Sequence, residues 1–229
     1  KTTESISAGV NEIVRRGALP VLLGGDHYLT YPAFEGFALG MAECKQGARL
    51  GHVHIDSHTD FRDAYASLGR YNHGTCVRRL SENPMIAYAN MAWVGLNGSI
   101  LDADIYRLYK SHGLRMISSN DVRERGICEV IEEVLEAAAD GADAVYVSVD
   151  IDVVDSAYAP GTGVPVFDGM TAQDFLRAME TLSGYDTIGA IDLCEVSPPF
   201  DPSGRTAYLA ANGLVAFLGR YLFDSVDLG

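Results

Sequence analysis

Short apolar runs alternate along the chain with segments whose apolar residues recur every three to four positions. The runs are typical of buried strands, and they predict six strands, at 19–23, 49–55, 91–96, 114–117, 144–149 and 187–193. The helical period covers 31–41, 102–112, 128–139, 174–182 and 206–223, and an amphipathic helix with an apolar stripe through Ile6, Val10, Ile13 and Val14 opens the chain. Several strands are apolar on both faces, so we predict an α/β fold, a three-layer sandwich in which helices cover both faces of a mainly parallel sheet.

No repeat, low-complexity tract or linker divides the 229 residues, so residues 1–229 are expected to form a single domain. No window approaches the 18 or so apolar residues of a membrane span, and a membrane partner is not expected. Lys1 leads directly into a helix with no strand before it. We therefore expect an amino-terminal segment of a longer protein to be missing from this sequence.

The balance of charge, 17 Lys and Arg against 31 Asp and Glu, gives a formal net charge of −14. This argues against a nucleic-acid partner, because phosphate binding needs a cationic face. The four cysteines form no Cys-x-x-Cys pair, so a structural zinc site is not indicated. Free, mostly buried thiols and the lack of a signal-peptide pattern favour a reducing compartment, and we expect a cytoplasmic protein.

Ionisable residues follow four of the predicted strands. The segments are Gly24-Gly25-Asp26-His27, the run HIDSHTD at 54–60, the run SVDID at 148–152 and Asp192-Leu193-Cys194-Glu195. In open parallel sheets the carboxyl ends of the strands share one edge, where ligands bind. These groups are therefore expected to converge although they lie far apart in the sequence.

The spacing D-x-H-x-D places two carboxylates and an imidazole on one side of an extended segment, and the D-x-D at 150–152 repeats the arrangement. Four carboxylates a few ångströms apart would repel one another strongly unless cations compensated them. Oxygen and imidazole donors without thiolate suit manganese better than structural zinc. We expect two Mn²⁺ ions, with His27, Asp56, His58, Asp60, Asp150 and Asp152 as ligands.

Other residues of these segments have plainer interpretations. Asp26 is favoured as a helix cap or as a partner of a ligand over a ligand itself. His52, His54 and His112 are interpreted as structural histidines.

GGDH, HIDSHTD and SVDIDVVDSAYAPGTG, in this order, resemble the signatures of the ureohydrolases, the family of arginase and agmatinase. The resemblance continues through His73-Gly74-Thr75 and EVSPPFD and covers nearly the whole chain, and APGTG and SPPFD favour the agmatinase branch. It implies an arginase-like fold, a homo-oligomer (trimer or hexamer) and a dinuclear manganese site on the same six residues. It also implies that His73 shuttles protons and that Glu195 holds the guanidinium group. We count Asp60 as a catalytic residue as well as a ligand.

The resemblance implies an amidinohydrolase in which a metal-bridging hydroxide cleaves a guanidino compound to urea and an amine. Agmatine, a substrate of polyamine metabolism, is the favoured guanidino compound. The loop 61–71 should wall the pocket, and it holds both acidic residues and Arg62 and Arg70. Either arginine facing inward would favour a carboxylate tail instead, as in guanidinobutyrate, and Arg62 is included among the substrate-binding residues. The small departures from the family pattern, such as Val164 and Asn97, also leave the substrate open.

Two rivals remain at this point. A non-catalytic ureohydrolase-like binding protein is expected to have lost a ligand, and none is missing here. A dinuclear phosphoester hydrolase would need cationic clamps for phosphate, against which the acidic edge and Glu195 argue.

Overall fold

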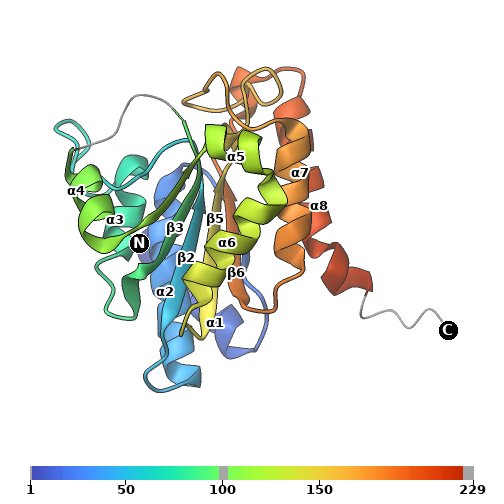
Figure 1. The fold of residues 1–229 in the computed structure, drawn as a ribbon. Coiled ribbons are helices and arrows are strands. Elements are labelled where there is room, and N and C mark those ends of the chain that lie inside the picture. The colour runs from blue at the N-terminus through green and yellow to red at the C-terminus, as the bar shows by residue number, and fades with distance from the viewer. Residues whose placement is uncertain (1, 98–102, 224–229) are drawn as a thin grey trace.

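The computed structural model describes residues 2–97 and 103–223 and confirms the predicted α/β sandwich, with helices on both faces of one parallel sheet (Figure 1). The strands are β1 (Val21–Leu23), β2 (Leu50–Ile55), β3 (Ile86–Leu96), β4 (Arg115–Ser118), β5 (Ala144–Asp150) and β6 (Ile188–Cys194). The helices are α1 (Thr2–Arg15), α2 (Thr30–Cys44), α3 (Cys76–Leu80), α4 (Ala103–His112), α5 (Ser119–Arg125), α6 (Ile127–Ala139), α7 (Ala172–Ser183) and α8 (Arg205–Phe223). The strand order is β1-β6-β5-β2-β3-β4, and every neighbouring pair is parallel.

The six predicted strands and the six predicted helices are all present, with differences at their ends. Position 102, the first residue of one predicted helix, lies outside the described residues. α7 begins two residues earlier than predicted, because Thr171 and Asp174 form a reciprocal capping box at its amino end. The short helices α3 and α5 and the first five residues of β3 were not predicted, because five to seven residues are too few for a helical period to be recognised.

The two faces of the sheet bury different side chains. Leu50, Trp93 and Tyr146 belong to the core cluster that contains residues of α1, α2, α3 and α4, whereas Val53 and Val147 belong to the cluster with α5, α6, α7 and α8. This alternation follows the period of two along each strand. None of the described helices is long and apolar enough to cross a membrane.

A row of buried polar residues interrupts the apolar core on the α2 side. His54 of β2, Ser148 of β5 and Asp192 of β6 are in register with one another, and all three are fully buried. Two residues further along the strands, Asp150 is in register with Cys194, and Asp56 directly follows the last residue of β2. The carboxyl ends of the central strands therefore direct polar groups to one face of the sheet.

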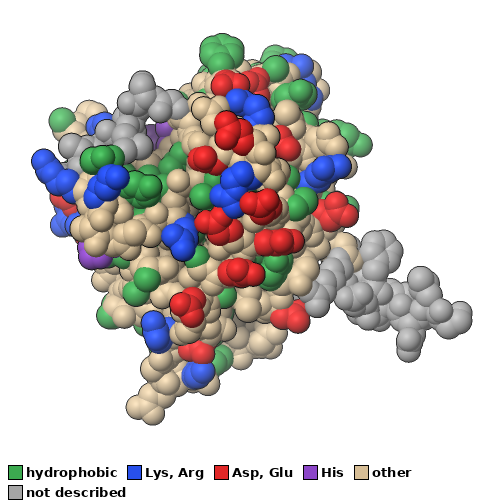
Figure 2. Space-filling view, in the orientation of Figure 1, with side chains coloured by type: hydrophobic (Ala, Val, Ile, Leu, Met, Phe, Trp, Pro, Cys, Tyr) green, Lys and Arg blue, Asp and Glu red, His purple; other side chains and the backbone are tan. Residues whose placement is uncertain are grey.

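Acidic side chains on α6 form ion pairs with basic side chains at the surface. On α6, Glu129 is 2.9 Å from Arg125, and Glu133 pairs with both Arg125 and Arg115. Figure 2 shows acidic and basic side chains interleaved over this face of the molecule.

Gly95, at the carboxyl end of β3, has a φ of 93°, and a Cβ added to it would lie 2.2 Å from Cγ2 of Val153. Gly47 has a φ of 73°, but no atom lies within 4 Å of its added Cβ. Both substitutions by alanine cost about 1–2 kcal/mol for the left-handed backbone, but only Gly95→Ala also forces a clash. We therefore expect Gly95→Ala to lower the Tm, measured by thermal denaturation, by much more than Gly47→Ala does. Equal decreases in Tm would mean that Val153 moves aside at little cost.

Candidate metal centre

Asp56 and Asp150 lie where β2 and β5 end, and each carboxylate holds the residue two positions further on. Oδ1 of Asp56 accepts a hydrogen bond from the N–H of His58 at 2.6 Å, and Oδ1 of Asp150 accepts one from the N–H of Asp152 at 2.7 Å. Such bonds from an aspartate to its own backbone turn the chain sharply. The expected extended D-x-H-x-D segment is therefore wrong, since β2 stops at Ile55 and residues 151–153 form a 3₁₀ turn.

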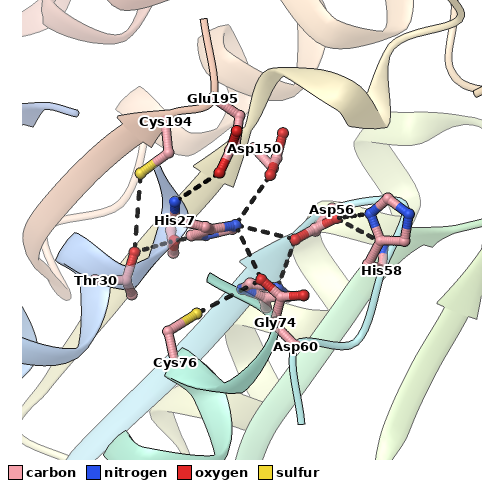
Figure 3. Close-up of polar contacts among 12 residues, drawn as sticks. His27, Thr30, Asp56, His58, Asp60, Gly74, Cys76, Asp150, Cys194 and Glu195 are labelled. Carbon is pink, nitrogen blue, oxygen red and sulfur yellow. Dashed lines mark hydrogen bonds and ion pairs between the residues drawn. The ribbon is translucent and has the colours of Figure 1, made fainter. Parts of the chain in front are cut away.

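Three carboxylates surround one nitrogen of His27 (Figure 3). Nδ1 of His27 lies 3.0 Å from Oδ2 of Asp150, 3.1 Å from Oδ2 of Asp56 and 3.3 Å from Oδ2 of Asp60. A short 3₁₀ helix before α2 carries His27, and Asp26 caps that helix by accepting the N–H of Tyr28 at 2.9 Å. The interpretation of Asp26 as a helix cap is confirmed.

A second cluster adjoins the first through Asp56. Nδ1 of His58 lies 3.2 Å from Oδ2 of Asp152 and 3.4 Å from Oδ1 of Asp56. The six residues predicted as ligands thus form two neighbouring groups that share Asp56. Donor atoms of His27, Asp56 and Asp60 lie within 4.8 Å of one another, and so do those of Asp56, His58 and Asp152. Asp150 joins the first group through its contact with His27. The predicted ligands converge because the side chains of Asp56 and Asp150 close turns at the ends of β2 and β5.

The charges of the two clusters do not balance. Burial, and then the neighbouring carboxylates, raise the pKa of Asp60 and Asp150 well above the usual range and that of Asp152 to about 6. Burial opposes a charged His58, but its hydrogen bonds with Asp152 and Asp56 prevail and raise its pKa to about 11. These shifts mean that the apoprotein must hold extra protons where divalent cations would otherwise compensate the carboxylates.

The donor atoms fit a hard divalent ion. All four cysteines are free, and Cys76 and Cys194 are buried near the clusters, whereas Cys44 and Cys128 are exposed, contrary to expectation. Burial raises the pKa of the Cys76 and Cys194 thiols well above the usual range, so they remain protonated and are poor ligands. Carboxylate oxygen and imidazole nitrogen remain, and this donor set suits manganese.

His54, which sequence reasoning left as a structural residue, belongs to the first cluster. Its Nε2 lies 2.9 Å from Oδ2 of Asp56, and its ring stacks on that of His27 with the centroids 4.8 Å apart. Burial lowers the pKa of His54, so the imidazole is neutral. The available signal was its position two residues before Asp56, on the same side of the strand.

Metal binding to these clusters should release protons, because a histidine binds a metal only in its neutral form. At pH 7 the apoprotein holds a proton on His58, whose pKa is about 11. Its loss makes the affinity for Mn²⁺ rise with pH by about one log unit per pH unit for each proton released. Calorimetric titration of the apoprotein with Mn²⁺, in two buffers of different ionisation enthalpy, measures the number of protons released on binding. Heats that do not depend on the buffer would contradict the protonated clusters.

A pocket of about 920 Å³ opens onto both clusters. His73, Glu195 and Arg62, the residues predicted to act on the substrate, all line it, together with apolar residues such as Leu96 and Met116. Glu195 has a φ of 66°, and its Oε1 accepts the N–H of His27 at 2.7 Å. This bond fixes Glu195 beside the candidate metal ligands.

The loop 61–71 presents one of its two arginines to the pocket. Arg62 lines it, with its guanidinium 5.1 Å from the centre of the Tyr65 ring. Arg70 is not among the residues that line the pocket, and its Nη2 lies 3.2 Å from both Asp63 and Glu82. Of the two arginines in this loop, the structure thus places at the pocket Arg62, the one counted among the substrate-binding residues from the sequence.

The chain matches the Arginase family model over residues 1–219. It is 36% identical over 213 residues to the mitochondrial guanidino acid hydrolase of Homo sapiens, and the matched region covers 93% of this chain and 58% of that protein. It is 35% identical over 214 residues to the mitochondrial agmatinase of Gallus gallus, with 93% and 60% covered. Among solved structures, proclavaminate amidino hydrolase from Streptomyces clavuligerus has a TM-score of 0.79 and 31% identity, with 96% of this chain and 70% of that chain covered. The chain thus spans about three fifths of the length of these two curated relatives.

Proposed function

Because the chain belongs to the arginase family, we propose that it is a manganese-dependent amidinohydrolase that cleaves a guanidino compound to urea and an amine. The observation that carries this proposal is the pair of ligand clusters sharing Asp56 at a pocket that Glu195 and His73 also line. We also propose that residues 1–229 are one catalytic domain.

The clusters divide the ligands between two ions. His27, Asp56, Asp60 and Asp150 would hold one Mn²⁺, and His58, Asp56 and Asp152 would hold the other. Two such ions lower the pKa of a water molecule, which supplies a strong nucleophile near neutral pH. The remaining chemistry belongs to the protein side chains.

Glu195 binds the guanidinium group of the substrate. A carboxylate matches the planar fork of a guanidinium and forms charge-assisted hydrogen bonds with two of its N–H groups. The bond from His27 holds the Glu195 carboxylate in place, so the carbon to be attacked is oriented toward the metal ligands before the reaction.

His73 transfers the proton that the departing amine needs. Its side chain is exposed in the pocket, on a 3₁₀ turn that Asn72 caps by accepting the N–H of Gly74 at 3.1 Å. An imidazole can both accept and donate a proton, and the exposed His73 can exchange protons with water, as a general acid in this position must.

His73→Ala should lower kcat by about 10²–10⁴-fold, the range that positioned acid–base groups supply, and should leave the manganese content unchanged. Steady-state urea formation and metal analysis of the purified variant measure the two effects. His112, which contacts the ring of Tyr88 and is not among the residues that line the pocket, gives the control His112→Ala. Lost manganese in His73→Ala would instead make His73 a ligand.

For the tail of the substrate, we propose a carboxylate, as in a guanidino acid. Arg62 supports this, since it lines the pocket while Arg70 is engaged by Asp63 and Glu82. Agmatine, the substrate that the sequence favoured, is the second candidate. Asp26 in the pocket wall and the similarity to the agmatinase of Gallus gallus support it.

A comparison of kcat/KM for guanidinobutyrate, agmatine, arginine and guanidine, with Mn²⁺ added and urea as the readout, tests the proposal. Guanidinobutyrate should be the best of the four. Preference for agmatine would overturn the carboxylate tail and keep the amidinohydrolase. Tightly bound manganese with no urea from any guanidino compound would favour the binding-protein rival.

A further inference from the structure

A buried hydrogen-bonded chain lies behind His27, on the side away from the carboxylates. Nε2 of His27 is 2.7 Å from Oγ of Ser148, and that hydroxyl donates to Oδ1 of Asp192 at 2.8 Å. His27 is 1% exposed, and Ser148 and Asp192 are fully buried. Figure 3 shows Thr30 and Cys194, which also contact Asp192, on the opposite side of His27 from Asp56 and Asp60. The chain therefore reaches His27 from within the core, where water does not compete.

Asp192 is the acceptor at the end of this chain. Besides Ser148, it accepts hydrogen bonds from the hydroxyl of Tyr146 at 2.6 Å, from Oγ1 of Thr30 at 2.9 Å and from Sγ of Cys194 at 3.3 Å. Burial raises the pKa of both the Tyr146 hydroxyl and the Cys194 thiol well above their usual ranges, so these groups keep their protons and donate. Ser148, Tyr146, Thr30 and Cys194 thus all donate hydrogen bonds to Asp192, so its carboxylate acts only as an acceptor toward them.

The protons of the chain can then be counted. Ser148 has a single O–H, and that proton is directed to Asp192. The hydroxyl oxygen can only accept from the imidazole, so the proton between His27 and Ser148 belongs to Nε2. A metal ion can bind His27 only in its neutral form. With one proton kept on Nε2 by Ser148, that form has its lone pair on Nδ1, the nitrogen that faces Asp56, Asp60 and Asp150.

We infer that Ser148 and Asp192 are positioning residues that fix the tautomer and the ring orientation of His27, so that Nδ1 is presented to a metal ion. The inference rests on the proposed function, because it concerns the metal that this function requires. Neither residue lines the pocket, and both act through His27. A hydrogen bond to the second nitrogen of a ligating histidine commonly changes metal affinity by about 10–100-fold.

The test is Mn²⁺ binding to the apoprotein, measured by calorimetric titration. Ser148→Ala should weaken one of the two Mn²⁺ ions by about 10–100-fold and leave the other near its wild-type affinity. Ser148→Thr, which keeps the hydroxyl, should restore the weakened site. Tyr146→Phe is the matched control, because it removes a hydrogen bond from the same Asp192 without touching His27; it should lower the Tm and keep both affinities.

A spectroscopic readout separates positioning from a general loss of stability. In protein labelled with ¹⁵N-histidine and loaded with diamagnetic Cd²⁺, the Nε2–H proton of His27 should exchange slowly with water in the wild type and in Tyr146→Phe. It should exchange faster in Ser148→Ala. If Ser148→Ala does not fold, Asp192→Asn addresses the same chain, since an amide can donate to Ser148 and reverse the proton order, and the same loss of affinity is expected.

The outcomes are distinct. A Ser148→Ala protein, or an Asp192→Asn protein if the former does not fold, with wild-type affinity for both ions and a slowly exchanging His27 proton would overturn the inference. Equal weakening by Tyr146→Phe would also overturn it, because the effect would then come from core packing. A wild-type protein that binds no Mn²⁺ and forms no urea would refute the proposed function itself.

Discussion

Asp152→Ala should lose bound manganese and urea-forming activity together. Oδ2 of Asp152 lies 3.2 Å from Nδ1 of His58, and apart from the shared Asp56 it is the carboxylate of that cluster. Ser57 holds it there, donating from Oγ to Oδ1 of Asp152 at 2.7 Å. Removing it leaves His58 and Asp56 to bind the second ion. A catalytic metal contributes several kcal/mol to the transition state, so kcat should fall by about 10³-fold or more.

Metal analysis after gel filtration and the urea assay measure the two losses in one preparation. Asp155→Ala is the control within the same loop. The carboxylate of Asp155 accepts the N–H groups of Ala157 and Asp168, and it belongs to neither cluster. This variant should keep its manganese and most of its activity. An Asp152→Ala protein that kept both metal and turnover would show that Asp152 is not a ligand.

The location of the site could be predicted from the sequence because it depends on topology alone. Strands that are apolar on both faces indicate a parallel sheet covered by helices on both sides, and the carboxyl ends of such strands share one edge. The sequence therefore predicts that the ionisable residues at the ends of β2, β5 and β6 meet. The way they meet was mispredicted, because turns capped by Asp56 and Asp150 replace the assumed extended backbone.

The supporting residues could not be found in this way. His54, Ser148 and Asp192 form one row only because β2, β5 and β6 pair in a particular register, and a single sequence does not reveal register. Taken separately, each is a polar residue in a mostly apolar strand. The ion pairs that remove Arg70 from the pocket depend in the same way on the conformation of the loop.

Local backbone strain at the site is a further feature that could not be predicted from the sequence. Asp60 and Glu195 are two of the three described non-glycine residues with a positive φ, at 46° and 66°. This conformation is costly for any residue with a Cβ, and such residues cluster at functional sites. In both cases it accompanies a carboxylate that lines the pocket.

Glu195→Gln should lower kcat/KM for the guanidino substrate by about 10²–10⁴-fold, since it removes the charge from two charge-assisted hydrogen bonds. The glutamine side chain has the same size, and its carbonyl oxygen can still accept the N–H of His27 that Oε1 accepts now. The manganese content and the Tm should therefore stay near the wild-type values. Steady-state kinetics with metal analysis and thermal denaturation measure these quantities.

Glu180→Gln, at an exposed position of α7 that is not among the residues lining the pocket, controls for the loss of one negative charge from an acidic protein. It should leave kcat/KM unchanged. If Glu195→Gln lost manganese instead, Glu195 would act through the metal cluster and not on the substrate. If its kcat/KM equalled that of the wild type, the guanidinium would have to be held by another carboxylate that lines the pocket, and Asp26, which caps the turn bearing His27, would be the next residue to replace.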